Sequence, residues 1–191
     1  MNTLKTAEFI ELHRNDDIRK LALMGAKFPD VDMAYALNQI AGWQTAREKL
    51  PSWAAMAGIV YPPHISMEQC SSESTARYKA DAVRRITNRN TETTDCDNCM
   101  ADLTGGLGVD VSFIAPLFDK AIYVERQQLL CDIARRNFST LGIEHAEVLC
   151  SDGLEALKTM KPLLFAYLDP SRRDNHGQRI YALEDCAPNV I

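Results

Sequence analysis

Apolar residues recur at the three- and four-residue spacing of amphipathic helices over about the first 90 residues. Aspartates suited to capping such helices stand ahead of two of the runs, and Pro62-Pro63 interrupts the pattern. We therefore predict a small all-helical domain over residues 1–90. The capping candidates are Asp16, Asp17, Asp30 and Asp32. The inward-facing residues are Ile18, Leu21, Ala22, Met33, Leu37, Ile40, Ala41, Ala76, Ala80 and Val83.

Beyond a polar stretch without periodicity, residues 91–98, the pattern changes to short apolar runs that alternate with helical ones. The polar stretch is typical of a linker. The alternation predicts an α/β domain over residues 99–191, with a parallel sheet and helices on both faces. Its strands are expected at residues 99–104, 121–125, 146–151 and 163–169, and its helices at 111–118, 129–141 and 153–160.

Composition narrows the class of protein. Hydrophobic residues make up 46% of the 191 residues and charged residues 25%, which favours a packed core over disorder. The formal net charge of −5 excludes a protein that coats nucleic acid by charge alone. The chain lacks an apolar run of the roughly 20 residues that a membrane helix needs, and it lacks a basic-then-apolar leader. These features predict a cytoplasmic protein that contacts no membrane.

Cys96 and Cys99 form a single C-x-x-C without a second pair, so no metal site is predicted.

One predicted helix carries both the inward residues Ala76, Ala80 and Val83 and a set of basic residues. That set has two interpretations: a solvated helix face, or a surface that contacts nucleic-acid phosphates. The basic residues are Arg77, Lys79, Arg84 and Arg85.

Polar residues suited to ligand binding follow each predicted strand. Ligands of open parallel sheets bind beyond the carboxyl ends of the strands, where glycines let a ligand approach the backbone closely. An acid about twenty residues beyond such glycines is placed to hold the ribose of an adenosine cofactor. Four such endings in order predict an adenosine-cofactor site. Its binding residues are predicted to be Asp102, Thr104, Gly105, Gly106, Gly108, Asp110, Glu125 (for the ribose) and Asp152 (for the adenine edge).

The glycine-rich segment distinguishes between cofactors. The dinucleotide pattern G-x-G-x-x-G/A would end at Val111, which is neither glycine nor alanine. The stretch from Asp102 to Gly108 instead resembles motif I of the class I methyltransferases, commonly D-x-G-x-G-x-G, with Thr104 in place of the first glycine. This resemblance implies a Rossmann-like core that binds S-adenosylmethionine (SAM).

A more specific family resemblance rests on several of these motifs taken together. ADLTGGLGVD, the acid Glu125, SDG, DPSRRDNHGQR and the upstream MEQCSSESTARYK together resemble the bacterial THUMP-like-domain methyltransferases, from about residue 20 to residue 188. The resemblance implies a SAM-dependent methyltransferase that acts on RNA. It implies catalytic roles for Asp169 and Pro170 as hydrogen-bond acceptors for a target amine, and for Arg172 as a contact to a base or phosphate.

Members of this family carry a further C-terminal half, so the resemblance implies a truncated chain. The fourth strand would then form an open apolar edge through which the chain self-associates. Two alternatives to a methyltransferase remain open at this point: a nicotinamide-dependent oxidoreductase, and a non-catalytic binding module with the SAM fold.

Overall fold

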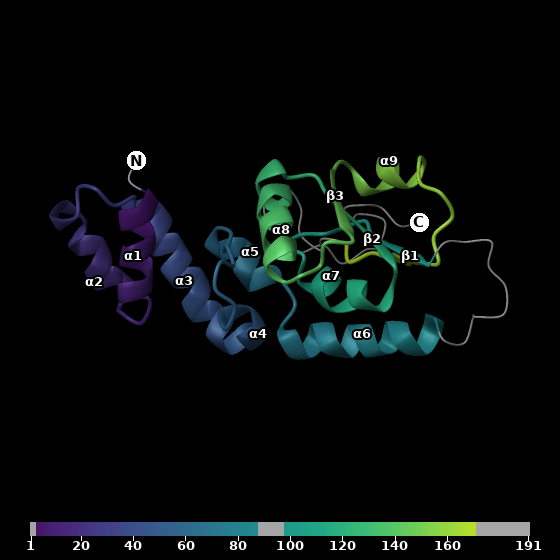
Figure 1. The fold of residues 1–191 in the computed structure, drawn as a ribbon, viewed down its shortest axis with the longest axis horizontal. Helices are drawn as coiled ribbons and strands as arrows, with labels where there is room; N and C mark the ends of the chain where they lie inside the picture. Colours follow the sequence, from purple (N-terminus) through teal and green to yellow (C-terminus); the bar gives the residue numbers. More distant parts are fainter. Residues whose placement is uncertain (1–2, 88–97, 171–191) are drawn as a thin grey trace. The chain divides into compact units, whose positions relative to one another are not determined.

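The computed structural model describes residues 3–87 and 98–170, apart from the side chains of residues 3, 64 and 65. The chain divides into two compact units, Met1–Thr75 and Ala76–Ile191 (Figure 1). None of the helices in the described part of the chain combines the length and the apolarity that crossing a membrane would require.

The first unit is helical, as predicted. Asp17 caps α2 (Ile18–Leu23) by accepting from the backbone N–H of Lys20, and Asp32 caps α3 (Met33–Lys49) by accepting from that of Tyr35. Both α1 and α2 pack along α3 (Figure 1). The elements are α1 (Thr3–His13), α2 (Ile18–Leu23), a 3-10 turn (Gly25–Lys27), α3 (Met33–Lys49), α4 (Pro51–Ala54) and α5 (His64–Gln69). Their shared core contains Phe9, Leu21, Ala36 and Ile40.

Helix α3 also fixes the irregular segment that precedes α5. The Gln39 amide clamps the backbone of Tyr61, donating to its carbonyl and accepting from its N–H, both at 2.9 Å. Gly42 lies one turn further along α3, and a Cβ there would come within 2.2 Å of the Tyr61 Cβ. A glycine in this helix therefore serves close packing.

Helix α6 (Glu73–Thr87) belongs mainly to the second unit, although the sequence pattern grouped it with the first. Its residues Ala80 and Val83 are buried in the core that lies against one face of the sheet. The boundary between the two units consequently falls at Thr75–Ala76, whereas the linker was expected at residues 91–98, of which 91–97 lie outside the described residues.

The second unit is built on a four-stranded parallel sheet in the order β3-β2-β1-β4. The chain runs outward from β1 to β3 and then returns to the other side of β1, so the strand order reverses between β1 and β4. The strands are β1 (Cys99–Asp102), β2 (Lys120–Glu125), β3 (Ala146–Cys150) and β4 (Phe165–Tyr167), and the helices between them are α7 (Val109–Ile114), α8 (Gln128–Thr140) and α9 (Gly153–Leu157).

Helices cover both faces of this sheet, as predicted. Side chains alternate along β2: Ala121 and Tyr123 pack in the core with α6, α7 and α8, whereas Ile122 and Val124 pack on the opposite face with Ala156 of α9. Figure 1 shows α6 and α7 on one side of the strands and α9 on the other. Because β2 is buried on both faces, its sequence is almost continuously apolar.

Several predicted elements were too long, among them the helix expected at 153–160, which ends at Leu157. Only residues 165–167 of the expected strand 163–169 pair with β1, and all three are at least partly exposed to solvent. The first strand ends at Asp102 rather than Thr104 because the chain turns there into the glycine-rich loop. Helix α7 ends at Ile114, and Pro116 lies in the 3-10 turn that follows it (Ala115–Leu117), since proline lacks the N–H that would continue the α-helix.

We predict that Gly42→Ala destabilises the helical unit. Alanine gains about 1 kcal/mol in helix propensity over glycine, but the new methyl would lie 2.2 Å from the Tyr61 Cβ, which no side-chain rotation can move. Overpacking of this kind costs about 1–3 kcal/mol, and the short distance places it at the upper end. Both tryptophans of the chain, Trp43 and Trp53, lie in this unit, so urea unfolding followed by tryptophan fluorescence reports on it selectively.

Gly25→Ala is the matched control, since its Cβ would make only an ordinary contact with Met33 at 3.6 Å. Its unfolding midpoint should stay close to that of the parent chain. Equal midpoints for the Gly42 and Gly25 variants would contradict the packing argument.

Candidate functional site

The glycine-rich loop that follows β1 needs glycine for two distinct reasons. Gly106 and Gly108 have φ of +54° and +82°, in the left-handed region that side chains disfavour. A Cβ on Gly105 would instead collide with the ring of Tyr123 at 2.2 Å. The loop therefore lies directly against β2, where the Gly105 N–H donates to the carbonyl of Val124 at 2.9 Å. These contacts bring the predicted cofactor loop and the end of β2 together.

Glu125, at the end of β2, reaches across to this loop. One carboxylate oxygen accepts from the N–H of Gly106 at 3.0 Å, and the other accepts from the N–H of Gln127 at 2.8 Å. The Tyr123 hydroxyl donates to the carbonyl of Gly106, so side chains of β2 bond both the N–H and the carbonyl of that residue. A carboxylate offers about four acceptor positions; Glu125 thus retains capacity for ligand hydroxyls while it shapes the loop.

Asp102 lies at the tip of the central strand and is 1% exposed. Its carboxylate accepts from the backbone N–H of Thr104 at 2.8 Å and from the Thr104 hydroxyl at 3.3 Å. Burial raises the pKa of Asp102 to about 7, and the nearby carboxylates of Asp110 and Asp169 act in the same direction. This acid therefore changes its charge near neutral pH.

Thr104 occupies the position where motif I commonly has its first glycine, and its hydroxyl forms two links. It donates to Asp102 and accepts from the backbone N–H of Asp169 at 2.7 Å. A glycine could form neither bond. The threonine thus ties the end of β4 to the loop that follows β1, on both sides of the point where the strand order reverses.

A second polar cluster lies beside this link. The Asp110 carboxylate, 13% exposed, accepts from Lys79 Nζ at 2.8 Å and from the Tyr167 hydroxyl at 3.2 Å. The same ammonium group lies 3.4 Å from the carboxylate of Asp169. Desolvation acts to lower the pKa of Lys79, but its contacts with Asp110 and Tyr167 outweigh it, so the pKa rises above its usual value and the lysine stays charged.

Asp152 follows β3 and caps α9, which is the structural role that the sequence pattern also allowed. One oxygen accepts from the N–H groups of Leu154 and Glu155, while the other lies 3.7 Å from Arg126. Gly153 places this helix start against β1, since a Cβ there would lie 2.1 Å from the carbonyl oxygen of Leu103.

All the predicted cofactor residues therefore lie at the carboxyl end of one sheet, and Asp169 joins them through Thr104. The side chain of Asp169 is 59% exposed, and Pro170 follows it at the end of the described residues. Arg172 lies outside the described residues.

Sequence reasoning missed Lys79, Tyr123 and Tyr167 as members of this region. Lys79 had been grouped with the basic residues of α6 as a solvated or phosphate-contacting face, but its ammonium group points to Asp110 and Asp169. Of the other residues in that group, Arg77 lies over the ring of Phe113 at 4.9 Å, and Arg84 pairs with Asp81.

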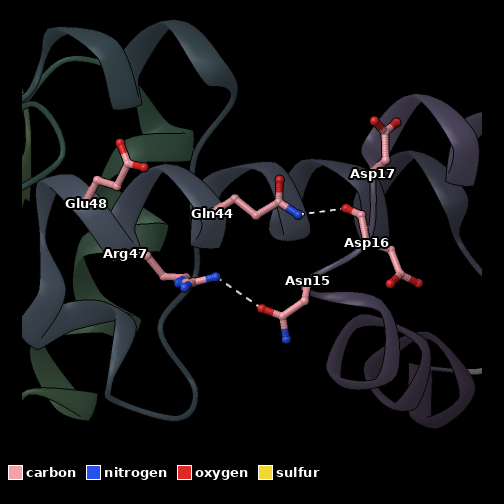
Figure 2. Close-up of a pocket in the computed structure, with 6 residues that line it drawn as sticks. All are labelled: Asn15, Asp16, Asp17, Gln44, Arg47 and Glu48. Carbon is pink, nitrogen blue, oxygen red and sulfur yellow. Dashed lines mark hydrogen bonds between the residues drawn. The ribbon is translucent and has the colours of Figure 1, made fainter.

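A pocket of about 480 Å³ lies in the helical unit, between α3 and the loop that joins α1 to α2 (Figure 2). The Gln44 amide donates to the carbonyl of Asp16, and Arg47 donates to Asn15, so these side chains pin the loop to α3. The pocket therefore has the contacts of a structural junction. Its lining residues are Asn15, Asp16, Asp17, Gln44, Arg47 and Glu48.

The sheet order and the loop geometry define the Rossmann-like fold of class I methyltransferases. The chain is similar to a protein from Porphyromonas gingivalis W83 whose crystal structure is described as that of a "putative methyltransferase". The two are 28% identical with a TM-score of 0.70, and the likeness covers 98% of this chain and 44% of that protein. The chain thus spans less than half the length of this neighbour.

Two other solved structures are less similar, and their TM-scores are too low to support an argument. A rRNA methylase from Streptococcus thermophilus is 24% identical over 44% of this chain and 51% of its own, with a TM-score of 0.34. An O-methyltransferase from Bacillus cereus in complex with SAH is 18% identical over 68% and 55%, with a TM-score of 0.46. No protein-family model matches the chain. No curated protein is significantly similar to it.

We predict that Asp102 makes the α/β unit less stable as the pH rises from about 4 to about 7. Its ordinary pKa is 3.8 and its pKa in the fold is about 7, so over this range the folded chain retains a proton that the unfolded chain releases. The stability that protonated Asp102 contributes is fully present below about pH 4 and is lost as the pH rises through about 7. Each unit of pKa difference corresponds to about 1.4 kcal/mol, so the loss is on the order of a few kcal/mol.

Asp102→Asn keeps the acceptor for the Thr104 N–H and cannot ionise. Urea unfolding followed by far-UV circular dichroism, with tryptophan fluorescence marking the helical unit's transition, would compare the two proteins between pH 4 and 7. The difference in stability between parent and variant should change across this range. Two parallel pH profiles would show that Asp102 does not titrate in the way described.

Proposed function

We propose that this chain is the cofactor-binding part of a SAM-dependent methyltransferase and that its methyl acceptor is RNA. One observation carries the cofactor assignment: the Glu125 carboxylate and the glycine-rich loop are bonded to each other at the edge where ligands of this fold bind. The similarity to the Porphyromonas gingivalis protein supports it.

The backbone around Gly106 fits a bound cofactor. A Cβ on Gly106 would meet only the carbonyl oxygen of Thr104, at 3.8 Å, so the loop surface is open there. In our proposal Glu125 binds the ribose hydroxyls, Asp152 binds the adenine edge, and Asp102 and the loop amides bind the remaining polar groups. SAM supplies an electrophilic methyl group on a sulfonium centre. This chain's residues hold the reactants in line and limit the access of water.

Asp169 and Pro170 are proposed to receive the acceptor. The Asp169 carboxylate is exposed enough to take a hydrogen bond from a target amine, and the carbonyl of Pro170 is a second acceptor beside it. RNA is favoured by the D-P-S-R-R sequence and its resemblance to the THUMP-like methyltransferases. In this proposal Arg172 stacks on a base or binds a phosphate.

Calorimetry separates this function from a nicotinamide-dependent oxidoreductase. The parent chain should bind SAM and should not bind NADH, since Val111 breaks the dinucleotide pattern. Glu125→Ala should weaken SAM binding by about 1–3 kcal/mol, or roughly 5- to 150-fold, through loss of hydrogen bonds to a charged group.

Glu147→Ala is the control, because Glu147 is an exposed carboxylate in β3 that pairs with Lys120 rather than with the loop. It should leave SAM affinity unchanged. Binding of NADH in place of SAM, or equal affinities for the Glu125 and Glu147 variants, would refute the assignment of the cofactor site.

A methyl-transfer assay tests whether RNA is the methyl acceptor. With labelled SAM and total RNA, the protein should incorporate label that ribonuclease releases, and Asp169→Asn should reduce the rate by about 10- to 100-fold because the acceptor amine loses a charged partner. Label in protein that resists ribonuclease would contradict RNA as the acceptor. SAM binding without transfer to any acceptor would favour a non-catalytic module.

A further inference from the structure

Lys79, on α6, carries a charge that reaches two acids of the candidate site. Its ammonium group lies 2.8 Å from a carboxylate oxygen of Asp110 and 3.4 Å from one of Asp169. Asp110 stands in the first turn of α7, directly after the glycine-rich loop, whereas Asp169 follows β4. The lysine therefore bridges the two sides of the point where the strand order reverses.

The two acids are held to different degrees. Asp110 is 13% exposed and also receives the Tyr167 hydroxyl, so its position is fixed within the fold. The Asp169 side chain is 59% exposed, and Thr104 bonds only its backbone N–H, at 2.7 Å. Lys79 thus restrains the direction of the Asp169 carboxylate, which its backbone bond leaves undetermined.

The charges of the three side chains also indicate that Lys79 restrains the Asp169 carboxylate. Lys79, Asp110 and Asp169 together carry a net charge of −1 when all are ionised, and their separations are short. Without the lysine, the two carboxylates would lose the cation that bridges them, and like charges at short range repel. The exposed Asp169 would move, since Asp110 is held by its surroundings.

We propose that Lys79 is a positioning residue for methyl transfer: it holds the Asp169 carboxylate beside the cofactor loop by bridging it to Asp110. This inference rests on the proposed function and deepens it, because it assigns to α6 the orientation of the group that receives the acceptor. Lys79 contacts the acid and not the reacting atoms.

The first experiment tests, without any ligand, whether loss of the lysine loosens the segment that carries Asp169. Lys79→Met retains the apolar stem and removes the charge, and Lys79→Gln serves as a second variant should the first fold poorly. Amide hydrogen exchange across residues 167–169 should become faster in either variant. In Lys79→Arg, which keeps the charge, it should stay close to the parent rate.

Lys120→Met is the matched control. It removes a lysine–carboxylate pair of the same length, 3.4 Å to Glu147, at the opposite end of β2 from the site. Exchange at residues 167–169 should not change in this variant. If exchange there is also unchanged in Lys79→Met and Lys79→Gln, Lys79 does not hold Asp169, and the proposal fails.

The second experiment separates positioning from a general structural effect. In Lys79→Met the initial rate of methyl transfer from labelled SAM to total RNA should fall by about 10- to 100-fold, as small misplacements of a reacting group can cause. SAM affinity should change by less than about fivefold, the most that a partly exposed ion pair contributes. Lys79→Arg should recover most of the rate.

Equal losses of rate and SAM affinity would indicate that Lys79 supports the fold of the loop rather than Asp169, and would overturn the proposal. A parent protein that binds no SAM, or transfers no methyl group, would instead refute the proposed function. Hydrogen exchange still decides the contact between Lys79 and Asp169 in that case, so the two failures are distinguishable.

Discussion

The central place of β1, paired with β2 on one side and β4 on the other, is the constraint on which the candidate site depends. All four strands are parallel, so their carboxyl ends meet at one edge of the sheet. The strand order reverses beside β1, and in open parallel sheets this is the point where ligands bind. The acids that end the strands converge there from separate parts of the sequence.

One contact between the segments that follow β1 and β4 depends on a departure from the common glycine motif. Thr104 connects the buried Asp102 carboxylate to the backbone of Asp169 through one hydroxyl. The link joins an acid whose pKa is raised to about 7 with the segment proposed to receive the acceptor. A residue that looks like an imperfect match to the motif is therefore a structural connection that the common motif lacks.

Much of the α/β unit follows from local sequence. The positions of the glycines, Glu125 and Asp152 at the loop and strand ends could be predicted because turn geometry and strand ends depend on neighbouring residues. Lys79 could not, since helical periodicity places it on the polar face of α6 whether it meets solvent or two acids. The short span of β4 was likewise hidden, because an apolar run indicates burial and not how many residues pair. Periodicity likewise identifies an apolar face on α6 but not the core that receives it, which contains Ala80 and Val83 together with residues of the sheet.

The acids of the site fall into two groups by what holds them. Asp102, Glu125 and Asp152 accept hydrogen bonds from backbone N–H groups of the loops and helix starts beside them. Backbone donors are fixed by the fold, so these carboxylates are oriented before any ligand binds, and less of the binding free energy is spent on ordering them. Asp110 and Asp169 instead contact a lysine side chain from another helix, and of these two only Asp169 is largely exposed. Long side chains have more freedom than backbone amides. The group proposed to meet a large and variable acceptor is therefore the one that the fold leaves most adjustable.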